Sequence, residues 1–117
     1  MSEGALTTIT DRNLSELVSS PRAVLVLGKT DCGHCANYER EILAQIEAGA
    51  LEGVAIGKLM LDAPGSPRFK KQNPWIGQLD ALPYPLIFES GKLVTHFAAS
   101  RASYLIEKLE SVAGAEA

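Results

Sequence analysis

Lys29–Ala36, with the sequence KTDCGHCA, holds both cysteines of the chain, three positions apart. The stretch follows a short apolar run at residues 23–27, which is typical of a strand buried on both faces. After the stretch, apolar residues recur at helical spacing, and this pattern predicts a helix from about Gly33 to Glu47. The two cysteines are therefore predicted to lie where a strand turns into a helix.

The start of a helix is a favourable place for a reactive cysteine. Unpaired backbone N–H groups and the positive end of the helix dipole converge there, and both stabilise a thiolate. Cys32, the first of the pair, is therefore expected to be the more exposed and more acidic thiol, and the thiolate is the form that attacks. Cys35 follows one turn later on the same helical face. The alternative is a buried cysteine pair with no redox role.

The composition is typical of a globular protein. Its 117 residues are enough to bury a core, and we expect one domain over residues 1–117. The net charge of -3 gives no reason to expect nucleic acid or an anionic membrane as a partner. No apolar run approaches the ~20 residues of a membrane span and no secretory signal is visible, so a cytoplasmic location is expected. In that compartment two cysteines indicate redox or metal chemistry.

The remaining patterns predict strands and helices in alternation. Strands are predicted at residues 6–10, 23–27, 54–61, 86–88 and 93–98. The first of these is expected at an edge of the sheet, and a hairpin turn with Gly91 at positive φ joins the last two. The order β-α-β-α-β-α-β-β-α predicts an α/β fold whose central strands are covered by helices on both faces.

Capping residues indicate where the other helices begin. Thr10 or Asp11 is predicted to cap the first helix. Ser66 is predicted to cap a short third helix with Pro67 in its first position, and Ser100 to cap the last one. The segment 72–81 fits no regular element.

Nearly the whole chain resembles a thioredoxin-fold protein. The matching pieces are the cysteine motif after Val24–Leu27, the segment Lys58–Asp62, and Leu82–Pro83 at the opening of a strand that ends in Phe88–Gly91. The residues Cys-Gly-His-Cys are similar to the motif of protein disulfide isomerases. The resemblance implies a thioredoxin fold with a central mixed sheet, and a cis proline at Pro83 that faces the cysteines.

Some positions depart from the usual thioredoxin pattern. Asp31 stands where thioredoxins usually carry Trp, and Val26 stands where they carry a buried Asp. Ala98 replaces the glycine after the last strand, and extra residues centred on Trp75 precede Pro83. These departures concern the usual interaction surface and proton relay, and they leave the dithiol itself unchanged.

The resemblance implies a thiol–disulfide oxidoreductase that acts on protein disulfides. Cys32 would attack a substrate disulfide, and Cys35 would resolve the mixed disulfide and release the reduced partner. The Cys32–Cys35 disulfide would be the only redox group, without an organic cofactor. The expected partners are protein disulfides and an electron donor or acceptor, and the chain is expected to be a monomer. Whether it works as a reductase or as an oxidase or isomerase stays open, and a binding or regulatory module that uses the Trp75 segment is the alternative.

Three residues are candidates for tuning the dithiol. A protonated His34 would favour the Cys32 thiolate, whereas the charge of Asp31 would oppose it. Lys58 interrupts an apolar strand, and it is expected to be unpaired or to pair with Glu39 or Asp31. A Lys58 whose pKa is lowered by burial could accept the proton of Cys35, and the alternative is a side chain that reaches solvent past its apolar stem.

A substrate groove is expected around Gly33, Leu82, Pro83 and Trp75. The turn at Pro83 would leave the backbone of Leu82 open to pair with an extended substrate segment. Trp75 is predicted to pack near the dithiol, in place of the missing Trp. The alternative for Trp75 is a small satellite core under a long loop.

Metal binding is the rival chemistry for the cysteines. Structural zinc takes four ligands, and beside Cys32 and Cys35 the sequence offers only His34 and His96. His96 lies on a predicted strand, where a surface position is expected. We therefore expect no metal.

Overall fold

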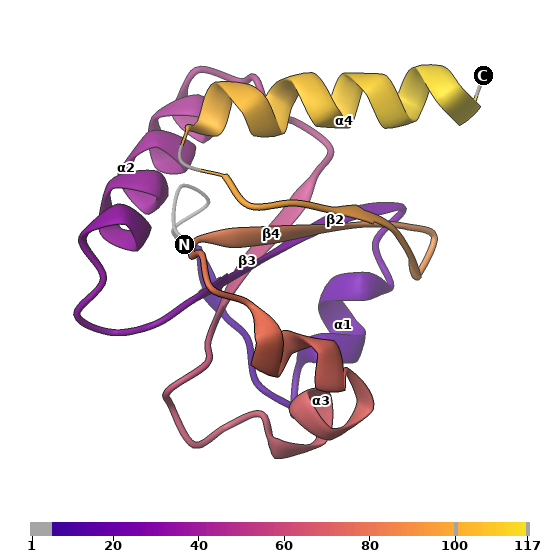
Figure 1. Cartoon of the computed structure of the whole chain (residues 1–117). Coiled ribbons are helices and arrows are strands. Elements are labelled where there is room, and N and C mark those ends of the chain that lie inside the picture. Colours follow the sequence, from indigo (N-terminus) through magenta and orange to yellow (C-terminus); the bar gives the residue numbers. More distant parts are fainter. Residues whose placement is uncertain (1–5, 100, 117) are drawn as a thin grey trace.

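The computed structural model describes residues 6–99 and 101–116, and over these residues the α/β class is confirmed (Figure 1). The strands are β1 (Thr7–Thr8), β2 (Arg22–Gly28), β3 (Ala55–Met60), β4 (Tyr84–Glu89) and β5 (Lys92–His96). The helices are α1 (Leu14–Val18), α2 (Gly33–Glu47), α3 (Pro67–Gln72) and α4 (Ala102–Glu116), with a 3₁₀ helix η1 (Pro74–Gln78) in the segment that the sequence left unassigned. None of these helices is long and apolar enough to cross a membrane.

The sheet is mixed, with the strand order β1-β3-β2-β4-β5. β1 and β2 both pair parallel with β3, and β4 pairs antiparallel with β2 and β5. Val26 lies opposite Lys58 on one side and Leu27 lies opposite Tyr84 on the other. The end of β2 and the start of β4 therefore lie side by side at the same end of the sheet. The cysteines follow β2, and Pro83 precedes β4.

Helices cover both faces of the sheet, as expected (Figure 1). Alternate residues of β2 point to opposite faces because the side chains of a strand have a period of two. Val24 and Val26 pack into the core beneath α2 and α4, whereas Leu25 and Leu27 pack into the core beside α1, α3 and η1. All four side chains are buried, which explains the apolar run without alternation at residues 23–27.

The structure supports Thr10, and not Asp11, as the residue that caps the start of the first helix. α1 begins at Leu14 with Asn13 in the formal N-cap position, but the Thr10 hydroxyl accepts from the backbone N–H of Arg12 at 3.2 Å and the Thr10 carbonyl accepts from that of Leu14 at 3.1 Å. The Asn13 side chain in turn accepts from the backbone N–H of Thr10 at 2.8 Å, as in a capping box.

The backbone N–H of Asp11 donates to the carbonyl of Gly65 at 2.8 Å, which brings the Asp11 side chain to the start of α3. The Asp11 carboxylate accepts there from the backbone N–H groups of Arg68 at 2.8 Å and Phe69 at 3.0 Å.

The third helix begins where the sequence predicts, with Pro67 in its first turn. Ser66 occupies the N-cap position, but its side chain makes no capping hydrogen bond because Asp11 already satisfies the free N–H groups. The predicted cap of the last helix, Ser100, lies outside the described residues. At the start of α4 the backbone N–H of Ala102 donates to Glu41 of α2 at 2.8 Å.

The first strand is shorter than predicted, and the turn between the last two strands agrees with the prediction. β1 has only two paired residues, shorter than the predicted strand 6–10, and it forms one edge of the sheet as expected. The hairpin between β4 and β5 has Ser90 at φ 52 and Gly91 at φ 85. Positive φ at both central residues matches the right-handed twist of the flanking strands.

Candidate active site

The cysteine pair lies at the turn between β2 and α2. Cys32 is the N-cap of α2 and has extended backbone angles, and its Sγ accepts a hydrogen bond from the backbone N–H of Cys35 at 3.1 Å. Asp31 precedes it with φ 56, so the chain reverses direction just before the helix. The predicted strand-to-helix turn is therefore present, and one free N–H group of the helix points at the first sulfur.

Gly28, the last residue of β2, allows the helix to approach the strand. A Cβ atom at this position would lie 3.3 Å from Cys35 Sγ, tighter than an ordinary van der Waals contact. A larger residue would push the first turn of α2 away from the sheet. The glycine thus helps to set how deeply Cys35 sits against β2.

Cys32 and Cys35 form a disulfide, with Cα atoms 5.2 Å apart. Both side chains are partly exposed, so the bond can be reached from solvent. After reduction, a hydrogen bond from the Cys35 N–H to Cys32 Sγ would stabilise the thiolate, which is the attacking form. The geometry therefore suits a reversible disulfide with Cys32 as the attacking thiol.

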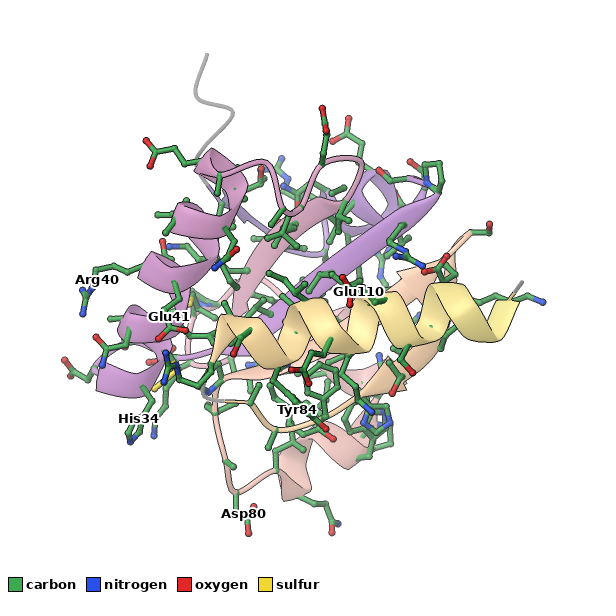
Figure 2. All side chains as sticks on the ribbon, turned by 90° about the horizontal axis from the view of Figure 1, so that it is seen from above. His34, Arg40, Glu41, Asp80, Tyr84 and Glu110 are labelled. Carbon is green, nitrogen blue, oxygen red and sulfur yellow. A yellow bond between two sulfur atoms is a disulfide. The ribbon has the colours of Figure 1, made fainter. Side chains whose placement is uncertain are left out.

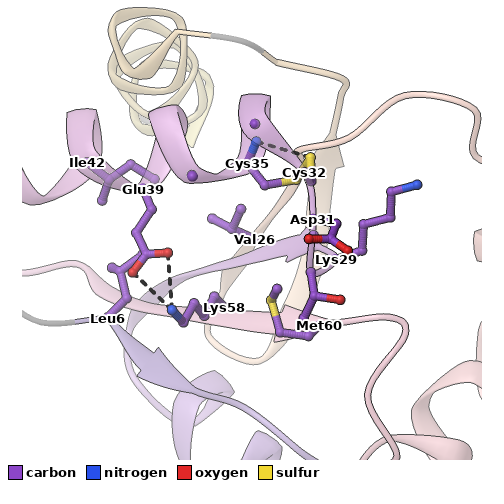
Figure 3. Close-up of a pocket in the computed structure, with 14 residues that line it drawn as sticks. Leu6, Val26, Lys29, Asp31, Cys32, Cys35, Glu39, Ile42, Lys58 and Met60 are labelled. Atoms are coloured by element: carbon purple, nitrogen blue, oxygen red, sulfur yellow. Dashed lines mark hydrogen bonds and ion pairs between the residues drawn. A yellow bond between two sulfur atoms is a disulfide. The ribbon is translucent and has the colours of Figure 1, made fainter.

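A cavity of about 570 Å³ opens beside the disulfide (Figure 3). Its apolar walls come from the N-terminal segment, β2, α2 and β3, through Leu6, Val26, Ile42 and Met60. The charged side chains that line it are Lys29, Asp31, Glu39 and Lys58. The cavity thus joins the sulfur atoms to a set of titratable groups.

Lys58 pairs with Glu39, which is one of the alternatives that the sequence left open. Its Nζ lies 3.1 Å from Oε1 and 3.0 Å from Oε2 of Glu39, and both side chains are partly buried (Figure 3). The pair links α2, which carries Glu39, to β3, which carries Lys58. In the sheet, Lys58 lies opposite Val26. Val26, where a buried acid would stand in thioredoxins, contributes an apolar wall.

Asp62 supports the cysteine loop from the end of β3, a role that no sequence pattern predicted. Its carboxylate accepts from the backbone N–H of Thr30 at 3.1 and 3.2 Å and from the Thr30 hydroxyl. These hydrogen bonds, the hydroxyl first, hold the pKa of Asp62 below its usual value, and Lys29 adds a smaller effect. The sequence feature that could have indicated this role of Asp62 is a polar residue directly after a strand that pairs with β2.

His34 is exposed at the free end of α2, and Figure 2 shows it pointing away from the body of the molecule. Asp31 and Gly33 are exposed on either side of Cys32. His34 also borders a polar depression with Arg40, Glu41 and Arg101. The predicted tuning residues thus surround the disulfide, and their effects on it stay predictions.

The Leu82–Pro83 peptide bond is cis, at the position that the resemblance implies. Pro83 is buried, and its carbonyl accepts from the backbone N–H of Ala99 at 3.2 Å. Because Tyr84 lies opposite Leu27, Pro83 reaches the edge of the sheet where β2 ends and the cysteine loop begins. The predicted groove residues Gly33, Leu82 and Pro83 therefore share one edge of the molecule.

Trp75 has other neighbours than the sequence predicts. Its ring stacks on His96, with centroids 4.8 Å apart and an interplanar angle of 25°, and lies 6.1 Å from the ring of Tyr84. The Tyr84 hydroxyl and His96 Nδ1 are hydrogen-bonded at 2.7 Å. Trp75 also packs against the core beside α1 and α3, and it does not line the cavity at the disulfide. The structure thus places Trp75 at the margin of one of the two main cores, and its proposed part in the groove stays a prediction.

Within the part of the chain that the structure describes, no group of three or more His, Cys, Asp or Glu side chains is placed to hold a metal ion. His96 is held by Tyr84 and Trp75. The cysteines are joined to each other.

No family model matches the chain, and no curated protein sequence matches it. Solved structures of thioredoxins do match nearly its full length. Oxidised mitochondrial thioredoxin 3 from Saccharomyces cerevisiae is 19% identical, with a TM-score of 0.73 over 95% of this chain and 99% of the other. The Trypanosoma brucei brucei thioredoxin is 18% identical, with a TM-score of 0.73 over 96% and 94%. A mutant thioredoxin from Halobacterium salinarum is 16% identical, with a TM-score of 0.73 over 95% and 93%. The chain therefore has the thioredoxin fold.

Proposed function

We propose that this chain is a thiol–disulfide oxidoreductase that exchanges electrons with protein disulfides through Cys32 and Cys35. The observation that carries the proposal is the accessible disulfide at the N-terminus of α2, with a backbone N–H directed at Cys32 Sγ. The placement of Pro83 at the same edge of the sheet supports it. The similarity to thioredoxin structures supports the fold on which this chemistry rests.

The reaction consists of two exchange steps. The Cys32 thiolate attacks one sulfur of a substrate disulfide, forms a mixed disulfide and releases the first substrate thiolate. Cys35 then attacks Cys32 Sγ, the intramolecular disulfide forms, and the second substrate thiolate leaves. Two electrons pass to the substrate, and an external donor must reduce the pair again. The steps run in reverse when the protein oxidises a dithiol.

The substrate is expected to lie against Gly33, Leu82 and Pro83. An extended segment can pair with free backbone groups, and this mode of recognition is tolerant of sequence. Protein disulfides in unfolded or extended segments are therefore the substrate class that we propose, with a monomeric enzyme. A cytoplasmic location stays a prediction.

Turnover of insulin with dithiothreitol as the electron donor tests the proposed function. The unchanged protein should accelerate the reduction, and Cys32→Ser should abolish the acceleration. Cys35→Ser should retain the first attack and accumulate a mixed disulfide with the substrate, which mass spectrometry detects. An unchanged protein that does not accelerate the reaction would contradict the proposal.

The direction of electron flow depends on the reduction potential of the Cys32–Cys35 pair. A value near the ~ -270 mV of thioredoxin would indicate a reductase, whereas a value near the ~ -180 mV of protein disulfide isomerase would indicate oxidation or isomerisation. A protonated His34 would move the potential toward the second value, because it stabilises the reduced form. Equilibration with glutathione buffers measures it.

A binding module without turnover is the second candidate. The stack of the partly buried Trp75 and Tyr84 with the exposed His96 is the feature that favours it, because aromatic side chains at a surface are common in binding sites. Trp75→Ala separates the two candidates. Unchanged insulin reduction in this variant would exclude Trp75 from the substrate groove, and an inactive protein whose partner binding requires Trp75 would favour the module.

A further inference from the structure

The surface beside His34 has a local charge opposite in sign to that of the whole chain. The chain has a net charge of -3. A depression of about 540 Å³ lies next to His34, and its lining includes Asn37, Arg40 and Glu41 of α2 together with Arg101, which precedes α4. Two arginines and one glutamate give this depression one net positive charge. An anionic ligand is therefore favoured there, although the protein as a whole is acidic.

The only carboxylate that lines the depression is committed to another element. Glu41 accepts from the backbone N–H of Ala102 at 2.8 Å, and it pairs with Nε of Arg101 at 3.2 Å. A carboxylate is stabilised in this place, because the N-terminus of α4 carries a partial positive charge. Among the described residues Arg101 uses only Nε, and its side chain is 72% exposed. Its two Nη groups can therefore bind a second carboxylate.

Arg40 is the other arginine of the depression. One of its Nη groups donates to the side-chain oxygen of Asn37, one turn earlier on α2, and this hydrogen bond holds the guanidinium along the helix. Over the part of the chain that the structure describes, no carboxylate lies within ion-pair distance of Arg40. In Figure 2 Arg40 and His34 both extend from α2 away from the body of the molecule. The charge of Arg40 is therefore available to an anionic group from outside.

The depression lies within reach of a substrate held at Cys32. Arg40 follows Cys32 by eight residues, which corresponds to roughly 12 Å along the axis of α2. Helical side chains lean toward the N-terminus, so the Arg40 guanidinium lies closer to Cys32 than its backbone does. An extended peptide covers about 3.3 Å per residue. A substrate side chain two to four residues from the reacting cysteine therefore spans this distance.

We propose that Arg40 and Arg101 form a carboxylate-binding site that selects protein disulfides with an acidic residue two to four positions from the reacting cysteine. This inference rests on the proposed function, because it places the substrate disulfide at Cys32. Each guanidinium binds a carboxylate through charge-assisted hydrogen bonds, with the planar geometry that suits both oxygens. A substrate lysine at the same position is repelled. His34, between the disulfide and the depression, offers a ring N–H as a further donor.

Three peptide disulfides test this preference. Each is a symmetric dimer of one short peptide with a single cysteine, and the third residue on either side of the cysteine is Glu, Gln or Lys. The reduced protein is mixed with each dimer and the reaction is stopped with acid. Mass spectrometry of the alkylated protein then gives the rate constant for formation of the Cys32–Cys35 disulfide.

We expect the Glu peptide to react faster than the Lys peptide by roughly fivefold to tenfold at low ionic strength. Single exposed ion pairs have small effects, and this comparison adds the attraction of one charge to the repulsion of the other. Added salt should reduce the difference. The net charge of -3 by itself would favour the Lys peptide, so the sign of the preference separates the local site from the overall charge.

Variants assign the preference to the two arginines. Arg40→Gln combined with Arg101→Gln should bring the rate constants of the Glu and Gln peptides together. The matched control is Arg12→Gln combined with Arg68→Gln, which removes two exposed arginines outside the depression and should keep the preference. Only the ratio of the two rate constants within each protein is compared, so any change in the dithiol itself cancels. Arg40→Glu combined with Arg101→Glu should reverse the preference and favour the Lys peptide.

The outcomes distinguish this inference from the proposed function. Unchanged protein that reacts equally with the three peptides, or fastest with the Lys peptide, would overturn the inference and leave the exchange chemistry intact. A preference for Glu that persists without both arginines, or that is lost equally in the matched control, would also overturn it. Reduced protein that none of the peptide disulfides oxidises would contradict the proposed function itself.

Discussion

Asp62 shows how one exposed residue can support the active-site loop. It lies just after β3, and its carboxylate accepts from both the backbone N–H and the hydroxyl of Thr30, two residues before Cys32. Hydrogen bonds to the ionised form stabilise it, which is why the pKa of Asp62 is lowered in the folded protein. The ionisation of Asp62 is thereby linked to the stability of the fold.

The sign of this linkage gives a prediction for Asp62→Asn. A carboxyl group whose pKa is lower in the folded state adds stability above the pKa of the unfolded chain, about 3.9, and loses it as the pH falls through the folded value. Asp62→Asn should therefore unfold at lower urea concentration than the unchanged protein at pH 7. The difference between them should shrink below about pH 4. Asp80→Asn, at another exposed position, is the control, and an equal difference at both pH values would contradict the prediction.

At the scale of elements, helix ends are satisfied by side chains from elsewhere in the chain. Asp11, before α1, accepts from two backbone N–H groups of α3, and Glu41 of α2 accepts from the backbone N–H of Ala102 in α4. Because α3 and η1 lead to β4, the contact at Asp11 ties the N-terminal segment to the part of the chain that precedes Pro83.

Asp11→Ala should therefore destabilise the protein by about 1 kcal/mol, the usual cost of removing a helix cap. Ser66→Ala is the matched control at the formal N-cap of the same helix. Its Oγ is buried without a hydrogen-bond partner in the described structure, so its removal should be neutral or slightly stabilising. Chemical denaturation measures the free energy of unfolding of both variants. A larger loss in Ser66→Ala than in Asp11→Ala would show that Ser66 is the functional cap.

At the scale of the whole molecule, the fold rests on two apolar cores rather than on the disulfide. Residues from β2 take part in both cores, one on each face of the sheet. The disulfide joins residues only three positions apart in the sequence. A loop of this length restricts the unfolded chain only weakly, and the chain-entropy relation gives about 2 kcal/mol for it.

The reduced protein should therefore remain folded. We expect its far-ultraviolet circular dichroism to match that of the oxidised protein, and its melting temperature to be lower by roughly 5–15 °C. Thermal unfolding with and without dithiothreitol measures the difference. Loss of a cooperative transition on reduction would contradict this prediction and would make the disulfide a structural element.

Local patterns in the sequence determined the strand-to-helix turn, the bounds of α2 at Gly33–Glu47 and the order of the elements. This succeeded because hydrophobic periodicity and cysteine spacing act over a few residues. The position of Pro83 also followed from the sequence, through its distance from the Phe88–Gly91 turn in the resemblance.

Only the tertiary structure decided which distant side chains meet. It assigned Asp11 to α3, chose Glu39 among the possible partners of Lys58, and placed Trp75 on His96. The physical reason is that a carboxylate can accept from any donor within reach, and an aromatic ring can pack on any apolar neighbour. The sheet order and the helix positions therefore select the partner, and no spacing along the chain encodes them.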